Sequence, residues 1–339
     1  MPGPTDSPLP LVGAPMAGGV STLGFVEAVG RAGAFPFLAA GYKSAQALSK
    51  DVADLRSTVG NFGVNLFVPD GSAPDPAAIA AYAQRLSAEA ERFSVSLDPT
   101  VVQDDDAWPE KVDLLVADPV PVVSLTFGLP PAADVARLRR AGSRVLATVT
   151  TLEEARAAAD LGVDALVVQG SAAGGHSATH DPARRLEPVR TADLVREIKA
   201  ALDLPLLAAG GVDGGDAVRS LLQAGADSVV VGTLLLLSDE AGTSPTHRAA
   251  LTDPRFTGTT ITHAFTGRPA RSLRNRFAEL YSAQAPIAYP AVHHLTRPLR
   301  QAAAAAGDAD LVHLWAGTGY RQARTGPVAE ILQGLASGL

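Results

Sequence analysis

The sequence contains no cysteine among its 339 residues. This absence excludes disulfide bonds, cysteine-ligated metal centres and a thiol nucleophile. Basic residues are also few relative to acidic ones, since 28 lysines and arginines against 35 aspartates and glutamates give a formal net charge of −7 at pH 7. Such a chain lacks the basic footprint of a nucleic-acid-binding protein, so we expect no nucleic-acid partner.

Long hydrophobic runs are missing as well. No apolar stretch is long enough to span a bilayer, and the first ten residues lack a basic region followed by an apolar one. We therefore expect a cytoplasmic protein without a membrane partner. The chain does have the material for a large core, because 47% of its residues are hydrophobic and only 19% are charged.

Short apolar runs alternate with longer helical patterns over the first 237 residues. Many of the helical segments begin at Ser, Thr or Asp and end at Gly, as capped helices do. The predicted strands are Leu11–Met16, Phe35–Ala40, Gly63–Val68, Val122–Phe127, Val145–Val149, Ala165–Gln169, Pro205–Ala209 and Val229–Gly232. The predicted helices are Ser21–Ala32, Ser44–Thr58, Asp75–Arg92, Ala132–Ala141, Leu152–Leu161, Thr191–Leu202 and Gly215–Ala224. This α/β alternation favours a parallel (β/α)8 TIM barrel over an open sheet.

The alternation ends after Leu237. Residues 238–309 contain helical patterns and polar loops but no clear strand, which predicts a mainly helical insertion that caps the barrel near the substrate site. The barrel then consists of residues 1–237 and 310–339, with a last helix near Pro327–Leu335. Within the insertion we interpret a set of basic residues as solvated or ion-paired at the surface: Arg268, Arg271, Arg274, Arg276, His293 and His294.

Three predicted strands run directly into glycine turns. The strand that ends at Gln169 continues into a glycine-rich loop that ends at His176. Side chains just past the carboxyl end of a barrel strand face the ligand site, so His176 is the candidate catalytic residue. The turns at Gly210-Gly211 and Gly232-Thr233 suit a phosphate bound by backbone N–H groups.

A metal site is the alternative for His176, because His180 follows four residues later with Asp181 beside it. The glycines before His176 argue against a helix that would align the two histidines, so we expect no metal.

These blocks resemble the nitronate monooxygenases, formerly called 2-nitropropane dioxygenases. The resemblance is carried, in order along nearly the whole chain, by Ala14–Ser21, Gly63–Phe67, Gln169–Gly170, Ala173–His176, Ala208–Val212, Val231–Thr233, Thr266–Arg271 and Trp315–Gly319. It is more specific for the superfamily than for the reaction, because the FMN-dependent enoyl-acyl-carrier-protein reductases share the barrel, the flavin and the Gly-Gly-His loop. One departure is Ala172, which stands where the family motif Gly-x-Glu-Ala-Gly-Gly-His has glutamate.

The resemblance implies a flavoprotein oxidoreductase that uses FMN and O2 to oxidise alkyl nitronates, and nitroalkanes where it can deprotonate them, to carbonyl compounds and nitrite. It implies that His176 is the catalytic acid–base residue. It also implies FMN contacts from Ala14, Pro15, Met16, Asn65, Gln169, Gly174, Gly175, Gly210, Gly211, Val230, Val231, Gly232 and Thr233.

Two other functions stay open at this point. One is an FMN reductase that uses NAD(P)H on an unsaturated acyl thioester, and the other is a phosphate-binding barrel without a redox role. The sequence also leaves the oligomeric state open, a homodimer included.

Overall fold

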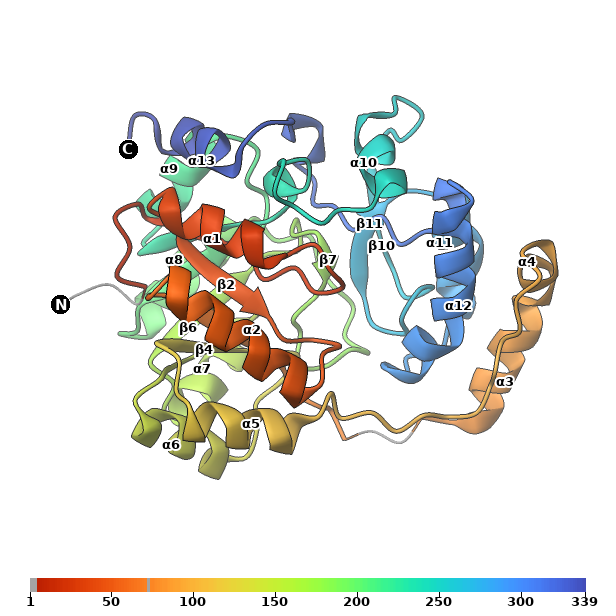
Figure 1. Ribbon diagram of the computed structural model, residues 1–339, viewed down its shortest axis with the longest axis horizontal. Coiled ribbons are helices and arrows are strands. Elements are labelled where there is room, and N and C mark those ends of the chain that lie inside the picture. Colours follow the sequence, from red (N-terminus) through yellow and green to blue (C-terminus); the bar gives the residue numbers. More distant parts are fainter. Residues whose placement is uncertain (1–4, 72–73) are drawn as a thin grey trace.

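The computed structural model describes residues 5–71 and 74–339. Its centre is a closed barrel of eight parallel strands surrounded by helices (Figure 1). All eight predicted strands lie in this barrel, so the predicted fold class is confirmed. In spatial order the strands are β1 (Leu11–Gly13), β2 (Phe35–Ala39), β3 (Gly63–Phe67), β4 (Val122–Thr126), β5 (Arg144–Val149), β6 (Ala165–Gln169), β8 (Leu206–Ala209) and β9 (Ser228–Val231), which pairs with β1.

Apolar side chains cover both faces of the barrel strands. In β5, Val145 and Ala147 belong to the large cluster between strands and helices, whereas Leu146 belongs to the interior cluster with Phe35 and Leu207. Successive side chains of a strand point to opposite faces, so a strand buried on both faces needs a continuous apolar run. This explains why the barrel strands were readable from the sequence.

The helices around the barrel follow the predicted caps. Thr22, for example, accepts a hydrogen bond from the N–H of Phe25 at 3.0 Å and so starts the first helix. One helix was not predicted, because it follows Ala107, which offers no side-chain cap. The outer helices are α1 (Leu23–Arg31), α2 (Ala45–Thr58), α5 (Trp108–Ala117), α6 (Ala132–Ala141), α7 (Leu152–Asp160), α8 (Thr191–Ala201), α9 (Gly215–Gln223) and α13 (Val328–Ala336).

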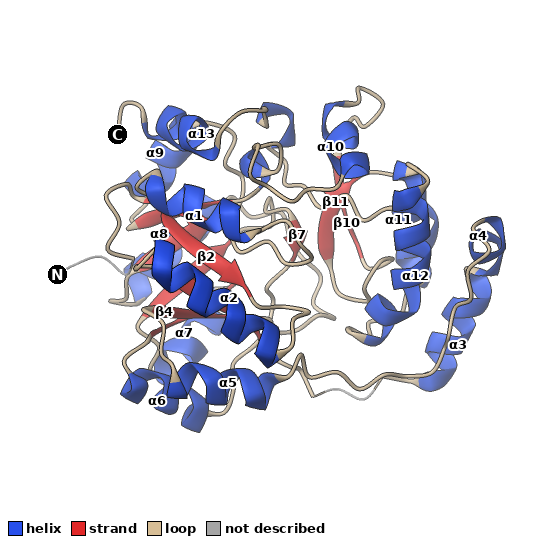
Figure 2. Ribbon diagram, in the orientation of Figure 1, coloured by secondary structure: helices blue, strands red, loops and turns tan. Residues whose placement is uncertain are grey.

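A second body of helices and strands, here called the cap, lies beside the barrel (Figure 2). Its helices include α10 (Pro245–Thr252), α11 (Arg276–Tyr281) and α12 (Ala291–Ala305). The expectation that residues 238–309 contain no clear strand is wrong, because β10 (Thr259–Thr262) and β11 (Ala270–Leu273) pair antiparallel. Each has only four residues, several of them polar, which is too short a pattern for hydrophobic periodicity to identify.

The short strand β7 (Gly175–His176) completes this sheet in the order β10-β11-β7. The glycine-rich loop that leaves the barrel therefore becomes the edge of the cap sheet, and the pairing of Ala270 with His176 fixes the candidate catalytic residue between the two bodies.

Residues from the barrel part of the chain also belong to the cap. The predicted helix Asp75–Arg92 is two helices, α3 (Pro76–Arg85) and α4 (Ser87–Arg92), and α3 packs against α12. Tyr82 is buried there, and its hydroxyl donates to the carbonyl of Ala264 at 2.7 Å. Within the part of the chain that the structure describes, no helix is long and apolar enough to cross a membrane.

Candidate functional site

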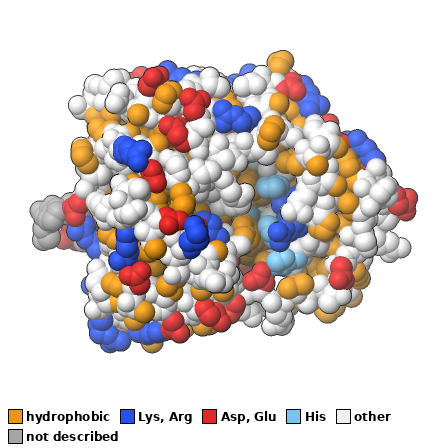
Figure 3. Space-filling model, viewed as in Figure 1, with side chains coloured by type: hydrophobic (Ala, Val, Ile, Leu, Met, Phe, Trp, Pro, Cys, Tyr) orange, Lys and Arg blue, Asp and Glu red, His pale blue; other side chains and the backbone are white. Residues whose placement is uncertain are grey.

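A cavity of about 560 Å³ lies between the carboxyl ends of the barrel strands and the cap. The space-filling view shows this hollow, and on its cap side it shows histidine side chains in pale blue next to basic side chains in dark blue (Figure 3). All the residues predicted from the sequence to bind FMN or to act in catalysis line this one cavity: Ala14, Pro15, Met16, Asn65, Gln169, Gly174, Gly175, His176, Gly210, Gly211, Val230, Val231, Gly232 and Thr233.

Glycine backbone forms one end of the cavity. Gly211 has a φ of +80°, which side-chain-bearing residues rarely adopt. The backbone N–H groups of Gly211 and Gly232 donate to no acceptor in the described part of the protein. Thr233 lies beside them, and its Oγ1 accepts a hydrogen bond from the N–H of Gly317 at 2.9 Å, so its own hydroxyl hydrogen stays available. This end of the cavity offers several donors to an anion.

The two amide side chains predicted to contact FMN are already engaged. Asn65 donates to the hydroxyls of Ser124 at 2.9 Å and Thr126 at 2.8 Å. Gln169 uses both ends of its amide, because its Nε2 donates to the carbonyl of His176 at 3.2 Å and its Oε1 accepts from the N–H of Ala178 at 2.8 Å. Gln169 therefore ties the segment that carries His176 to the end of β6.

His176 lies in an aromatic surrounding. Its ring contacts Phe127, Tyr289 and Trp315 at centroid distances of 5.5, 5.6 and 5.3 Å. Burial, followed by the positive charges of Arg268 and Arg300, lowers the pKa of His176 to about 3. The imidazole is therefore neutral at physiological pH and can accept a proton.

A hydrogen bond orients the ring of His176. Its Nε2 lies 2.9 Å from Oγ1 of Thr266, and this hydroxyl also lies 3.4 Å from the carbonyl of Arg268. Because a threonine hydroxyl can donate or accept, the contact fixes the orientation of the imidazole and is compatible with a hydrogen on either ring nitrogen.

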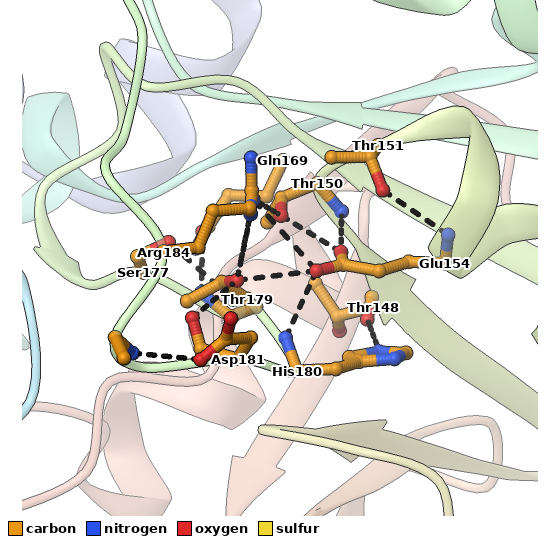
Figure 4. Close-up of polar contacts among 12 residues, drawn as sticks. Thr148, Thr150, Thr151, Glu154, Gln169, Ser177, Thr179, His180, Asp181 and Arg184 are labelled. Carbon is orange, nitrogen blue, oxygen red and sulfur yellow. Dashed lines mark hydrogen bonds and ion pairs between the residues drawn. The ribbon is translucent and has the colours of Figure 1, made fainter.

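A polar network secures the loop that follows His176 (Figure 4). Glu154 of α7 accepts hydrogen bonds from Thr150, from the hydroxyl of Thr179 at 3.1 Å and from the N–H of His180 at 3.0 Å. Burial would raise the pKa of Glu154, but these hydrogen bonds outweigh it and lower the pKa. The ring of His180 lies 3.1 Å from the carbonyl of Thr148, so this histidine belongs to the structural network around Glu154.

The sequence interpretation of Arg268 as a surface residue is wrong. Its side chain is fully buried, stacks 4.1 Å above the Phe127 ring and donates to the carbonyls of Phe127, Ser177 and Thr179. Carbonyl oxygens from two distant segments satisfy this guanidinium, which explains why the surrounding sequence gave no sign of its burial. By contrast Arg276 has the predicted ion pair, with Glu89.

The sequence analysis also missed most of the cap wall of the cavity. Arg300 of α12 is 5% exposed, and His293, which was interpreted as a surface residue, stacks on Tyr42 at 4.5 Å. His247 is buried, and its Nε2 has no partner among the described residues. A basic helical pattern alone cannot show which of its residues face a cavity. The cap residues of this wall are His247, Thr266, His293, Arg297, Arg300, Gln301, His313 and Trp315.

Comparisons with known proteins agree on one family. The family model described as nitronate monooxygenase matches residues 7–338. A protein of Staphylococcus aureus (strain Newman) described as a probable nitronate monooxygenase is 34% identical, over 96% of this chain and 93% of its own. A solved structure of nitroalkane oxidase from Streptomyces ansochromogenes is 46% identical, with a TM-score of 0.92 over 98% of this chain and 95% of that one. FabK from Thermotoga maritima shares the fold, with a TM-score of 0.75 at 22% identity over 98% of this chain and 93% of that one.

Proposed function

The chain belongs to the nitronate monooxygenase family and is a flavin-dependent oxidoreductase, and on this premise we propose that it uses FMN and O2 to convert alkyl nitronates into carbonyl compounds and nitrite. The observation that carries the proposal is a neutral His176 in the same cavity as a glycine-lined anion site. A cytoplasmic location and a homodimer remain predictions.

The residues present fit FMN. The free N–H groups of Gly211 and Gly232 and the hydroxyl of Thr233 provide for one terminal phosphate, and the sequence has no dinucleotide fingerprint with an acidic ribose partner. Ala14, Met16 and other small or apolar residues leave space along the barrel mouth for a flat ring. FMN supplies the electron-transfer chemistry, whereas the protein supplies position and electrostatics.

His176 handles the proton in this proposal. With a nitroalkane as substrate, the neutral imidazole of His176 takes the proton from the carbon next to the nitro group, and the hydrogen bond to Thr266 keeps the ring oriented while the charge develops. With a preformed nitronate no proton needs to be removed. Gln169 positions His176 through its carbonyl, and the rings of Phe127 and Trp315 pack beside the imidazole.

The test begins with the purified protein. We expect a yellow protein that releases FMN and not FAD on denaturation, and whose flavin spectrum changes when ethyl nitronate is added without oxygen. NADPH should leave the spectrum unchanged. Bleaching by NADPH alone would instead favour the reductase alternative, and a protein that binds no flavin after reconstitution would contradict the proposal.

A further inference from the structure

Arg300 is a buried cation that faces the cavity without a carboxylate partner. Its side chain is almost fully enclosed, and no aspartate or glutamate of the described residues forms an ion pair with it. Arg276, on the neighbouring helix α11, is instead neutralised by an ion pair, because its Nη1 and Nη2 donate to the carboxylate oxygens of Glu89 at 2.5 and 2.8 Å. Burial of an uncompensated charge is costly, so a protein that retains one commonly uses it for a ligand.

The hydrogen bonds of Arg300 determine the protonation state of two neighbouring histidines. Its Nη1 lies 3.1 Å from Nδ1 of His313, and its Nη2 lies 3.3 Å from Nδ1 of His293 and 2.9 Å from the carbonyl of the same residue. A guanidinium only donates hydrogen bonds, so one nitrogen of each ring must accept. Both rings are therefore neutral. His293 carries its hydrogen on Nε2, whereas Nη1 of Arg300 also lies 3.5 Å from Nε2 of His313.

The basic side chains on the cap side of the cavity face no acidic side chain among the described residues that line it. Among the described residues that line the cavity there is no aspartate or glutamate, whereas the lining includes Arg297, Arg300 and four histidines. Arg300 contributes a fixed positive charge, and His293 contributes a neutral Nε2–H donor. Such an arrangement favours negative charge over a neutral group of the same shape.

We propose that Arg300 determines substrate specificity by making the cavity select the anionic nitronate over the neutral nitroalkane, with His293 donating to a nitronate oxygen. This inference rests on the proposed function and assigns a role that is separate from that of His176. His176 processes the proton of a neutral substrate, whereas Arg300 positions a substrate that is already charged.

The experiment compares charged and neutral substrates in the holoenzyme. In Arg300→Gln we expect kcat/KM for ethyl nitronate to fall about 10- to 100-fold through a higher KM, because a hydrogen-bonded charge is lost. For freshly dissolved neutral nitroethane the KM should change less than threefold because this substrate binds uncharged, whereas kcat should fall because proton removal creates the nitronate beside Arg300. Calorimetric titration with sodium nitrite, which needs no turnover, should show a matching loss of affinity.

A matched set of variants makes the result decisive. Arg300→Lys keeps the charge and should restore most of the preference for the anion. Arg255→Gln removes a positive charge from an exposed cap arginine paired with Asp253, away from the cavity, and should leave both substrates unchanged. The inference is overturned if Arg300→Gln raises the KM of both substrates equally, if Arg300→Lys behaves like Arg300→Gln, or if Arg300→Gln loses FMN while nitrite affinity per bound flavin stays the same. Failure of the wild-type protein to oxidise ethyl nitronate would instead contradict the proposed function.

Discussion

His176 combines features that rarely occur together in a histidine near bulk solvent. It is enclosed by three aromatic rings, it is held by Thr266 through one nitrogen, and two arginine charges disfavour its protonation. These features keep a free lone pair on the imidazole at working pH, and the lowered pKa also makes it a weaker base than an ordinary histidine. The same features make imidazolium a poor candidate for stabilising an anion in the free enzyme.

Replacement of His176 by Asn tests its role as the base. The variant should fold and keep its flavin, lose about 100- to 10,000-fold of its activity on neutral nitroalkanes, and retain a substantial part of its activity on preformed nitronates, which arrive deprotonated. Initial rates with nitroethane and ethyl nitronate, expressed per bound flavin, provide the measurement. Unchanged rates with both substrates would remove His176 from the mechanism.

The low pKa of His176 also predicts the pH profile. A histidine with the ordinary pKa of 6.5 would be only about 3% neutral at pH 5, so the acid limb of kcat/KM would fall about thirtyfold. Because the pKa of His176 is about 3, kcat/KM for nitroethane should stay nearly flat between pH 8 and pH 5. An inflection near pH 6.5 in the free enzyme would contradict this assignment.

The same shift has a consequence for stability with a defined sign. The unfolded chain takes up a proton at His176 below pH 6.5, whereas the folded protein does so only near pH 3. Stability is therefore fully present above pH 6.5 and is lost as the pH falls toward 3. Urea denaturation at pH 7 and pH 5 should show a lower free energy of unfolding at pH 5, and a smaller difference in His176→Asn.

At the scale of elements, helix α7 holds the segment that follows His176. Glu154 is capped by Thr151 at the start of α7 and reaches across to Thr150, Thr179 and His180. The element thus joins the end of β5 to the loop after β7. Its contribution is one of orientation, because none of these atoms lines the glycine end of the cavity.

The substitution Glu154→Gln tests this connection. An amide oxygen can replace only one carboxylate oxygen as acceptor, so buried donors from Thr150, Thr179 or His180 lose partners, and we expect a loss of about 1–3 kcal/mol in the free energy of unfolding at pH 7. The pKa of Glu154 is lowered in the folded state, so its contribution is present above the ordinary value of 4.5 and is lost as the pH falls through the folded pKa. Denaturation from pH 7 to pH 3 should therefore show a smaller acid loss in the variant, and an equal loss would contradict the role of the carboxylate.

Whether a strand could be predicted from the sequence depended on whether its own residues carry a hydrophobic pattern. Barrel strands such as β6 are continuous apolar runs followed by glycine, so local residues alone identified them. The strands β10 and β11 are stabilised by pairing with each other, and β11 also pairs with β7, about 95 residues earlier; their own residues carry little pattern. Arg268 is similar, because its acceptors lie 89, 91 and 141 residues away in the sequence. Local patterns predicted the barrel half of the site, and the cap half required the fold.

At the scale of the whole molecule, the cavity depends on several parts of the chain meeting in three dimensions. The barrel supplies the glycine turns after β8 and β9, the insertion supplies α12, and the segment that returns to the barrel supplies Trp315 and Gly317. Gly317 and Gly174 are in such close contact that a Cβ on Gly174 would lie 2.4 Å from the N of Gly317. A cofactor at this junction would contact groups from separate segments, so its binding should stabilise the whole fold and not only one loop.

Thermal unfolding with and without FMN tests this coupling. At a free FMN concentration 100 times the Kd, binding adds about 2.7 kcal/mol, which should raise the Tm by several degrees. Thr233→Glu places a carboxylate beside the proposed phosphate position and should abolish the FMN-dependent rise while it changes the Tm of the apoprotein much less. Thr233→Ser keeps the hydroxyl that accepts from Gly317 and should retain the rise. If Thr233→Glu binds FMN with wild-type affinity, the phosphate lies elsewhere in the cavity, and the glycine turns after β8 and β9 serve only the packing of the returning segment.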